Sequence, residues 1–250
     1  MKNLSLTQKI ADGHSTVNGP GSDGDRPRAA RHIPDWSAEE RYMRAATIEH
    51  RKSLGQFFTP PRVAALMADW IAQASPRVIA DPALGTGILT RAALKRCPDA
   101  KVVAFETDRQ ILLHSDVGIP TQVEVRNDDF LYADIETYDA VTMNPPYIRH
   151  RKLEGFEKAR SAISVRAGFV IPKSANLYIY FVVKSCLSLR AGGRGAFLIP
   201  SEWLNANFSK SFKHYLLTEG GLRDIVLFSG CSNIFQDALT TASVLLVEKE

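Results

Sequence analysis

The sequence is poor in cysteine and has no two cysteines close together. Its three cysteines, Cys97, Cys186 and Cys231, are scattered along 250 residues and form no Cys-x-x-Cys pattern. An odd, scattered set of this kind argues against both a disulfide framework and a zinc site. We therefore expect reduced thiols and no bound metal.

Long apolar runs are also missing from the sequence. Runs such as Tyr178 to Val183 end well short of the ~18 residues that indicate a membrane span. The N-terminal residues lack the apolar region of a signal peptide. These absences predict a cytoplasmic protein with no membrane contact.

What the sequence does contain is typical of a globular protein. Hydrophobic residues make up 45% and charged residues 23% of the chain. A chain of 250 residues can bury the core of one large α/β domain. The formal net charge of +4 permits a nucleic-acid partner but is too small to demonstrate one.

The N-terminal segment differs in composition from the rest. Residues 1–34 are rich in Gly, Ser, Asp, Arg and Pro and have few residues that could build a core, which predicts a disordered leader. One ordered domain is expected over residues 35–250. Ser37 followed by Glu40 fits a capping box, which predicts a helix from Ser37 to about Glu49.

Short β-branched runs alternate with helical stretches along the remainder of the chain. This alternation predicts an α/β fold with a doubly wound, mainly parallel, seven-stranded Rossmann-like sheet. The last run follows the one before it after only a loop, which predicts an antiparallel pair at one sheet edge. The predicted strands are Arg77–Ala80, Lys101–Phe105, Gln122–Val125, Tyr138–Thr142, Gly195–Ile199, Asp224–Phe228 and Ala242–Val247.

A glycine-containing loop, Asp81 to Gly87, follows the first predicted strand. Gly85 and Gly87 can let the backbone approach a ligand at the carboxyl end of the sheet. The Asp81 carboxylate could accept a bond from the ammonium of a methionine moiety, whereas it would repel a phosphate. No Lys-Ser or Lys-Thr follows, so a P-loop is excluded. A simple tight turn accounts for the two glycines equally well.

Acidic residues also follow the second and third predicted strands. Glu106 lies 25 residues after Asp81, near the ~20-residue offset at which an acid binds ribose hydroxyls in dinucleotide folds. Asp129 and Phe130 offer a carboxylate for an adenine amino group and a ring for stacking, although Asp129 could instead be a solvated loop acid. Together these residues predict a site for S-adenosylmethionine (AdoMet).

The tetrapeptide Asn144-Pro145-Pro146-Tyr147 follows the fourth predicted strand, and we call it the catalytic lip. Residue frequencies predict it by chance in roughly one chain of this size per thousand. An aromatic amino nitrogen is a poor nucleophile, because its lone pair is delocalised into the ring. The Asn144 amide oxygen and the Pro145 carbonyl can accept its N–H bonds and direct the lone pair toward a methyl sulfonium.

The other lip residues suit the same chemistry. Pro145 and Pro146 stiffen the loop, and Tyr147 offers a stacking face worth about 1–3 kcal/mol per base. A base within a duplex would have to be flipped out to reach the lip. The Pro-Cys pair usual in cytosine carbon-5 methylation is absent. The lip therefore predicts AdoMet-dependent methylation of an exocyclic amine.

Basic residues gather directly after the lip. Between Tyr147 and Asn176 there are seven basic and two acidic residues, a balance of +5 that exceeds the net charge of the whole chain. Phosphate contact beside the active site is one interpretation, with Arg149, Arg151 and Lys152 as candidate residues. A solvated surface loop is the other.

These motifs resemble the γ-class, Taq-type N6-adenine DNA methyltransferases of restriction-modification systems. The likeness extends from Leu54 to Glu250 and includes an aromatic-Thr-Pro segment, the glycine loop and the lip, in that order. The resemblance implies methylation of adenine in DNA. It also implies AdoMet contacts by Phe58, Thr59 and Pro60, methionine binding by Asp81, Ala83 and Gly85, ribose binding by Glu106, adenine binding by Asp129 and Phe130, and a target base held between Tyr147 and Phe235.

One departure from the family concerns target choice. Members usually carry a separate target-recognition domain, and we expect that domain to be absent from this chain. Specificity would then come from a longer protein or a partner subunit, or would be low, and a cognate restriction endonuclease is a further expected partner. Methylation of RNA bases or of protein glutamine, and a catalytically silent DNA-binding or adaptor subunit, are the alternatives.

Overall fold

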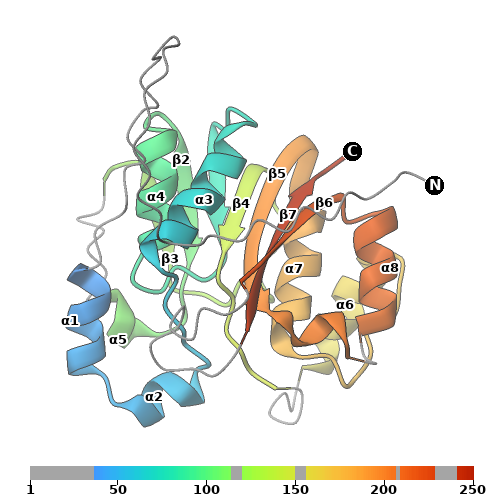
Figure 1. Ribbon diagram of the computed structural model, residues 1–250, viewed down its shortest axis with the longest axis horizontal. Helices are drawn as coiled ribbons and strands as arrows, with labels where there is room; N and C mark the ends of the chain where they lie inside the picture. The colour runs from blue at the N-terminus through green and yellow to red at the C-terminus, as the bar shows by residue number, and fades with distance from the viewer. Residues whose placement is uncertain (1–36, 114–119, 150–155, 207–208, 229–240) are drawn as a thin grey trace, which may run out of the picture.

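Figure 1 shows a computed structural model of the chain, in which helices cover both faces of one sheet. The structure describes residues 37–113, 120–149, 156–206, 209–228 and 241–250. The predicted leader, residues 1–34, lies outside the described residues.

The sheet has seven strands in the order β3-β2-β1-β4-β5-β7-β6. All neighbours pair in parallel except β7, which is antiparallel to both β5 and β6. The predicted mainly parallel α/β sheet is confirmed, and so is the antiparallel pair at one edge, where β6 is outermost. The strands are β1 Val78–Asp81, β2 Lys101–Phe105, β3 Val123–Arg126, β4 Tyr138–Met143, β5 Leu189–Pro200, β6 Leu222–Leu227 and β7 Ala242–Glu248.

Strand β5 begins earlier than the sequence predicts. Leu189 already pairs with Tyr138, and the register then shifts before Arg194 pairs with Ala140. A Cβ at Gly193 would lie 2.9 Å from two backbone carbonyl oxygens, so the shift depends on glycine at this point. Gly192 and Gly193 therefore lie at an irregularity between the two registers, within one longer strand.

Two sets of helices bury opposite faces of the sheet (Figure 1). Alternating strand residues serve the two cores, as Ile79 and Leu198 contribute to one and Ala80 and Phe197 to the other. No helix in the described ranges is long and apolar enough to cross a membrane. The first face is covered by α3 Pro61–Ala72 and α4 Ile88–Arg96, and the second by α6 Glu157–Ala167, α7 Leu177–Leu187 and α8 Lys210–Thr218.

The N-terminal region forms two short helices, so the prediction of one helix to Glu49 is wrong. Helix α1 covers Ser37–Ala45 and α2 covers Ile48–Ser53. The break has a local cause: Thr47 is extended, and its hydroxyl accepts a hydrogen bond from the His50 amide at 3.1 Å, which caps α2. Ser37 lies in the first turn of α1, and its side chain is outside the described part of the structure.

Helix α1 is joined to the glycine loop by Glu39. This carboxylate is fully buried, accepts a short hydrogen bond from the Thr86 hydroxyl and pairs with Arg91 at 2.9 Å. The sequence suggested Glu40 as the capping acid, yet it is Glu39 that makes the tertiary contact. Helix α1 therefore packs against the loop that follows β1.

Candidate active site

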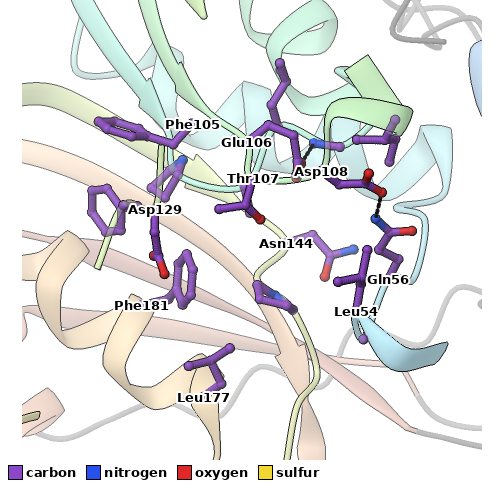
Figure 2. Close-up of a pocket in the computed structure, with 18 of the residues that line it drawn as sticks. Leu54, Gln56, Phe105, Glu106, Thr107, Asp108, Asp129, Asn144, Leu177 and Phe181 are labelled. Atoms are coloured by element: carbon purple, nitrogen blue, oxygen red, sulfur yellow. Dashed lines mark hydrogen bonds between the residues drawn. The ribbon is translucent and has the colours of Figure 1, made fainter. Parts of the chain in front are cut away.

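A cavity of ≈ 330 Å³ opens at the carboxyl ends of β1 to β4. Parallel strands bring these ends to one sheet edge, so loops far apart in the sequence meet there. Its walls come from Leu54–Thr59, the glycine loop, the loops after β2 and β3, and the catalytic lip. In Figure 2, Asp129 and Phe181 lie at one end, Gln56 and Asp108 at the other, and Asn144 between them.

The glycine loop forms one wall of the cavity. Gly85 and Gly87 have φ of 56° and 86°, in the left-handed region that favours glycine. Ala83 and Gly85 line the cavity, whereas Gly87 lies outside its lining and is the N-terminal cap of α4. The Gly87 amide donates to the Leu84 carbonyl at 2.8 Å, so this glycine closes the turn that presents the loop.

Asp81 lies beneath the glycine loop, outside the cavity lining. It is fully buried, and its Oδ2 accepts a hydrogen bond from the Thr90 hydroxyl at 2.8 Å. Burial raises its pKa to about 7, although bonds from Thr90 and from the Ala83 backbone oppose that shift. Asp81 thus supports the loop through Thr90, and its contact with a ligand ammonium stays a prediction.

Glu106 reaches the cavity from the end of β2. Its Oε2 accepts the Gly85 amide at 2.9 Å, and its Oε1 accepts the Asp108 amide at 2.8 Å. Burial raises its pKa, and these backbone bonds oppose the shift. Each carboxylate oxygen has a second lone pair, so the predicted bonds from ribose hydroxyls fit the geometry.

An aromatic corner forms the end of the cavity beyond β3. Phe130 packs edge to face with Phe105 at 5.3 Å and stacks on Phe181 at 5.8 Å, and all three rings line the cavity. Asp129 lies beside them, where its Oδ1 accepts the Leu131 amide at 2.9 Å. Burial raises the pKa of Asp129. The corner suits a flat, apolar ring with a polar edge.

Lys184 of α7 supports this corner, a role that sequence reasoning missed. The side chain is buried, and its Nζ donates to the Phe130 carbonyl at 2.5 Å and to the Ala133 carbonyl. Burial lowers the pKa of Lys184 to about 8, against the opposing effect of Asp129. A single lysine within an otherwise apolar helix was the available signal, because a buried lysine needs partners.

Asn144 occupies the middle of the cavity wall. Its Nδ2 donates to the Phe57 carbonyl at 2.6 Å and to the Thr59 hydroxyl at 3.1 Å. Its Oδ1 is buried and has no hydrogen-bond partner among the described residues. A buried amide oxygen without a donor is costly, so this atom is an acceptor that a ligand N–H could satisfy.

The other lip residues lie only partly in the cavity wall. Pro145 is buried and Pro146 lines the cavity. The Tyr147 ring is outside the lining, where it stacks on Phe57 at 5.0 Å and donates its hydroxyl to the Leu198 carbonyl at 3.4 Å. Burial raises the pKa of Tyr147 well above its usual value, so the hydroxyl stays protonated.

The aromatic-Thr-Pro segment contributes two of its three predicted residues to the cavity. Phe58 and Thr59 line it, whereas Pro60 lies outside the lining and caps α3. Phe58 also packs against the Tyr42 ring at 5.8 Å. Thr59 is 2% exposed, and its hydroxyl faces Asn144.

Asp108 forms a polar cluster with the N-terminal helices, and no pattern in the sequence indicated this cluster. Its Oδ2 accepts bonds from Tyr42 at 3.1 Å, His50 at 3.0 Å and Gln56 at 3.0 Å. Burial alone would raise the pKa of Asp108, but the bonds from Gln56 and His50 lower it below its usual range. Within the described ranges, no group of three or more His, Cys, Asp or Glu side chains could hold a metal ion.

The predicted DNA-contacting residues are only partly described. Arg149 is exposed directly after the lip. On and after α6, Lys158, Arg166 and Lys173 are also exposed. Arg151, Lys152 and Phe235 lie outside the described residues, so their placement stays a prediction.

Family models match most of the described domain. The model described as Eco57I restriction-modification methylase matches residues 101–235, and that described as N-6 DNA Methylase matches residues 37–104. The two matches overlap at residues 101–104 and together include the glycine loop, the lip and the aromatic-Thr-Pro segment.

Curated relatives agree with these matches. The chain is 34% identical over 223 residues to Type II methyltransferase M.AccI of Acinetobacter calcoaceticus, across 88% of this chain and 41% of that protein. It is 30% identical over 201 residues to Type II methyltransferase M.XamI of Xanthomonas campestris pv. amaranthicola, across 76% of this chain and 38% of that protein. The chain thus spans about two fifths of the length of these relatives.

Solved structures share the fold. A putative class I S-adenosylmethionine-dependent methyltransferase from Listeria monocytogenes superposes with a TM-score of 0.65 at 17% identity. The match covers 86% of this chain and 69% of that one. At this identity the likeness supports the architecture of the sheet and helices alone.

Proposed function

We propose that this chain, which belongs to the Eco57I restriction-modification methylase family, transfers a methyl group from AdoMet to the exocyclic N6 of adenine in DNA. The observation that carries the proposal is the Asn144 amide oxygen, which is buried in the cavity wall with no hydrogen-bond partner among the described residues. An exocyclic amine can supply the missing donor.

The residues of the cavity fit AdoMet along its whole length. Phe105, Phe130 and Phe181 suit the adenine ring, Glu106 suits the ribose hydroxyls, and the backbone of the glycine loop suits the methionine end. Bound AdoMet supplies a methyl group on a positively charged sulfur. Asp81 and Gly87 support the loop from outside the lining, and they remain among the proposed cofactor-binding residues.

The lip residues activate the acceptor nitrogen by accepting hydrogen bonds from its N–H groups. Asn144 Oδ1 and the Pro145 carbonyl hold the two N–H bonds, which localises the nitrogen lone pair for attack on the methyl carbon. The N–C bond forms as the S–C bond breaks, and one amine proton then passes to water. The Tyr147 hydroxyl takes no proton, since burial keeps it protonated.

Several surface features suit a DNA substrate. Arg149 lies next to the lip and is exposed, and the α6 region adds further exposed basic side chains. Neutralising phosphates in this way makes binding sensitive to salt. A target adenine in a duplex must be flipped out to reach Asn144, at a cost of a few kcal/mol. We propose that Tyr147 and Phe235 stack on the flipped-out adenine.

Target choice is proposed to depend on protein outside this domain. The sequence matches M.AccI and M.XamI over about two fifths of their length, which leaves most of each relative unmatched. A target-recognition domain or subunit, and a cognate restriction endonuclease, are the partners we propose. We also propose a cytoplasmic location, which the absence of a signal peptide in the sequence predicts and which suits a DNA substrate.

The proposal is tested by supplying labelled AdoMet with unmethylated DNA, total RNA or protein extract, and identifying the methylated product after digestion. We expect N6-methyladenine in DNA. Label on RNA bases or on protein glutamine would instead favour those substrates, which the same acceptor oxygens could serve. Absence of label in all three would favour a silent DNA-binding or adaptor subunit.

Two variants separate chemistry from folding in this assay. Asn144→Ala removes the acceptor oxygen and should abolish the label. Asn205→Ala changes an exposed asparagine outside the cavity and should keep wild-type activity. If the portion of the relatives that this chain does not match is needed for DNA binding, a longer protein that contains this chain should give label, and the same longer protein with Asn144→Ala should not.

A further inference from the structure

The segment Gly55–Thr59, which we call the brace, contacts the catalytic lip at both of its ends. The Phe57 carbonyl and the Thr59 hydroxyl accept the side-chain amide of Asn144, and the Gly55 carbonyl accepts the Tyr147 backbone amide at 2.9 Å. We propose that the brace is a positioning element for the lip, in which the Phe57 carbonyl sets the orientation of the Asn144 amide and the Thr59 hydroxyl holds it there. This inference rests on the proposed methyl transfer and assigns Thr59 a role distinct from cofactor contact.

The contacts of Asn144 allow only one orientation of its amide. The Phe57 carbonyl oxygen, 2.6 Å from the Asn144 side chain, can accept a hydrogen bond but cannot donate one. The amide must therefore present its NH₂ group to the brace, where Thr59 accepts the second N–H at 3.1 Å. With both N–H groups held, Oδ1 is turned to the opposite side, where an incoming amine can reach it.

The Tyr147 end of the contact depends on glycine. Gly55 has φ of +63°, a conformation that favours glycine, and a Cβ there would lie 2.7 Å from the Tyr147 nitrogen. The Phe57 ring then stacks on the Tyr147 ring with an interplanar angle of 29°. The brace and the lip are thus in backbone contact at one end and in side-chain contact at the other.

The brace is also connected to the cofactor side of the cavity. Gln56, in the middle of the brace, donates to Asp108 Oδ2 at 3.0 Å. The Asp108 amide in turn donates to Glu106 at 2.8 Å, at the proposed ribose end. One short segment therefore fixes the position of Asn144 Oδ1 relative to the cofactor side of the cavity, although some 85 residues separate Thr59 from Asn144.

Thr59→Val is the decisive substitution, because valine has nearly the shape of threonine and lacks only the hydroxyl. We expect about 5- to 10-fold lower kcat with an unchanged Kd for AdoMet, since one hydrogen bond of roughly 1 kcal/mol is lost. Thr59→Ser retains the hydroxyl and should restore kcat. Gly55→Ala should also lower kcat, by more than about tenfold, because the added Cβ would clash with the Tyr147 backbone. AdoMet binding should change little.

Three results would overturn the proposal. A weaker Kd for AdoMet with unchanged kcat at saturation would make Thr59 a cofactor contact. Unchanged kcat and Kd would show that the hydroxyl does not position Asn144. A kcat for Thr59→Ser as low as that of Thr59→Val would exclude the hydroxyl as the cause.

A measurement without substrate separates this inference from the proposed function. The side-chain amide of Asn144 can be followed by ¹⁵N NMR, with Asn144→Ala to identify its signals. Thr59→Val should accelerate exchange of these amide protons about fivefold, as expected for one lost hydrogen bond. Unaltered exchange would refute the brace. If wild type fails to methylate DNA but exchange responds as expected, only the proposed substrate is wrong.

Discussion

The two halves of the candidate site hold their polar groups in different ways. In the cofactor half, Glu106 and Asp129 accept backbone amides from their own or a neighbouring loop. In the acceptor half, Asn144 is held through its NH₂ group by a distant segment, and its oxygen has no partner in the described part of the chain. Glu106 and Asp129 are therefore hydrogen-bonded before a ligand binds, whereas Asn144 has an acceptor still to be satisfied.

This difference assigns AdoMet binding mainly to the cofactor half and methyl transfer mainly to the acceptor half. Groups that are already hydrogen-bonded shape a pocket and keep it rigid, so they favour affinity. An acceptor that is held in place without a donor forms its hydrogen bond when the reacting nitrogen binds. That bond stabilises the reacting group, and catalysis requires stabilisation there. Substitutions in the two halves should therefore affect different measured quantities.

The largest effect is expected for Asn144→Ala. Loss of the acceptor oxygen should lower kcat by about 10²- to 10³-fold, as for removal of one oxyanion-hole donor. Because Asn144 makes no bond to the glycine loop or Glu106, the Kd for AdoMet should stay within about twofold, which is smaller than one lost hydrogen bond. Single-turnover methylation and calorimetric AdoMet binding provide the two numbers. A parallel loss of AdoMet affinity would erase the distinction between the halves.

The next effect concerns stability and Asp81. The pKa of Asp81 is raised by burial to about 7, so the folded protein retains a proton that the unfolded chain releases above a pKa of 3.8. Its contribution to stability is fully present below pH 3.8 and is lost as pH rises to about 7, with a slope of at most about 1.4 kcal/mol per pH unit. Asp81→Asn should remove this slope.

Urea unfolding of wild type and Asp81→Asn between pH 4 and 8 measures the difference. The free energy of unfolding of the wild type should fall relative to that of the variant as pH increases. A constant difference across this range would mean that Asp81 is ionised in the folded protein.

Glu106→Gln should weaken cofactor binding with little effect on chemistry. The glutamine NH₂ group would face either the Gly85 amide or the Asp108 amide, so one backbone donor loses its acceptor. Losing a bond to a charged group costs roughly 1.5–3 kcal/mol, which corresponds to about a 10- to 150-fold higher Kd for AdoMet. At saturating AdoMet, kcat should remain near the wild-type value. A large fall in kcat at saturation would place Glu106 in the chemical half.

The smallest effect is expected at the DNA surface. Arg149→Ala removes one exposed charge beside the lip and should weaken DNA binding by several-fold, equally for all sequences. The slope of log K against log salt concentration should become shallower by about 1. Fluorescence anisotropy at several salt concentrations measures both quantities. An unchanged slope would show that Arg149 faces solvent in the complex.

Local patterns sufficed to predict much of the fold. Alternating β-branched and helical runs predicted the seven strands and their α/β order, since the hydrophobic pattern of each segment indicates how that segment is buried. The antiparallel pair followed from a short loop, but pairing of β7 with β5 as well as β6 depends on contacts between distant strands. The break before α2 escaped prediction, because Thr47 offered a cap stronger than the continuing helical pattern.

The sequence predicted the residues of the candidate site more fully than their arrangement. Glu106, Asp129 and Asn144 all follow parallel strands, so the topology alone brings them to one cavity. Asp81 and Gly87 follow the same rule yet lie outside the lining, since burial at a strand end and closure of a turn decide which loop atoms reach the surface.

By itself, the sequence determined the chemical groups of this protein and the sheet edge where they gather, because strand periodicity and short motifs act over a few residues. Only the tertiary structure decided which partners hold them. The Asn144 amide donates to Phe57 and Thr59, Asp108 accepts bonds from two N-terminal helices, and Lys184 supports the Phe130 loop. These contacts join residues more than 50 positions apart, and such pairings arise from packing, which no local pattern records.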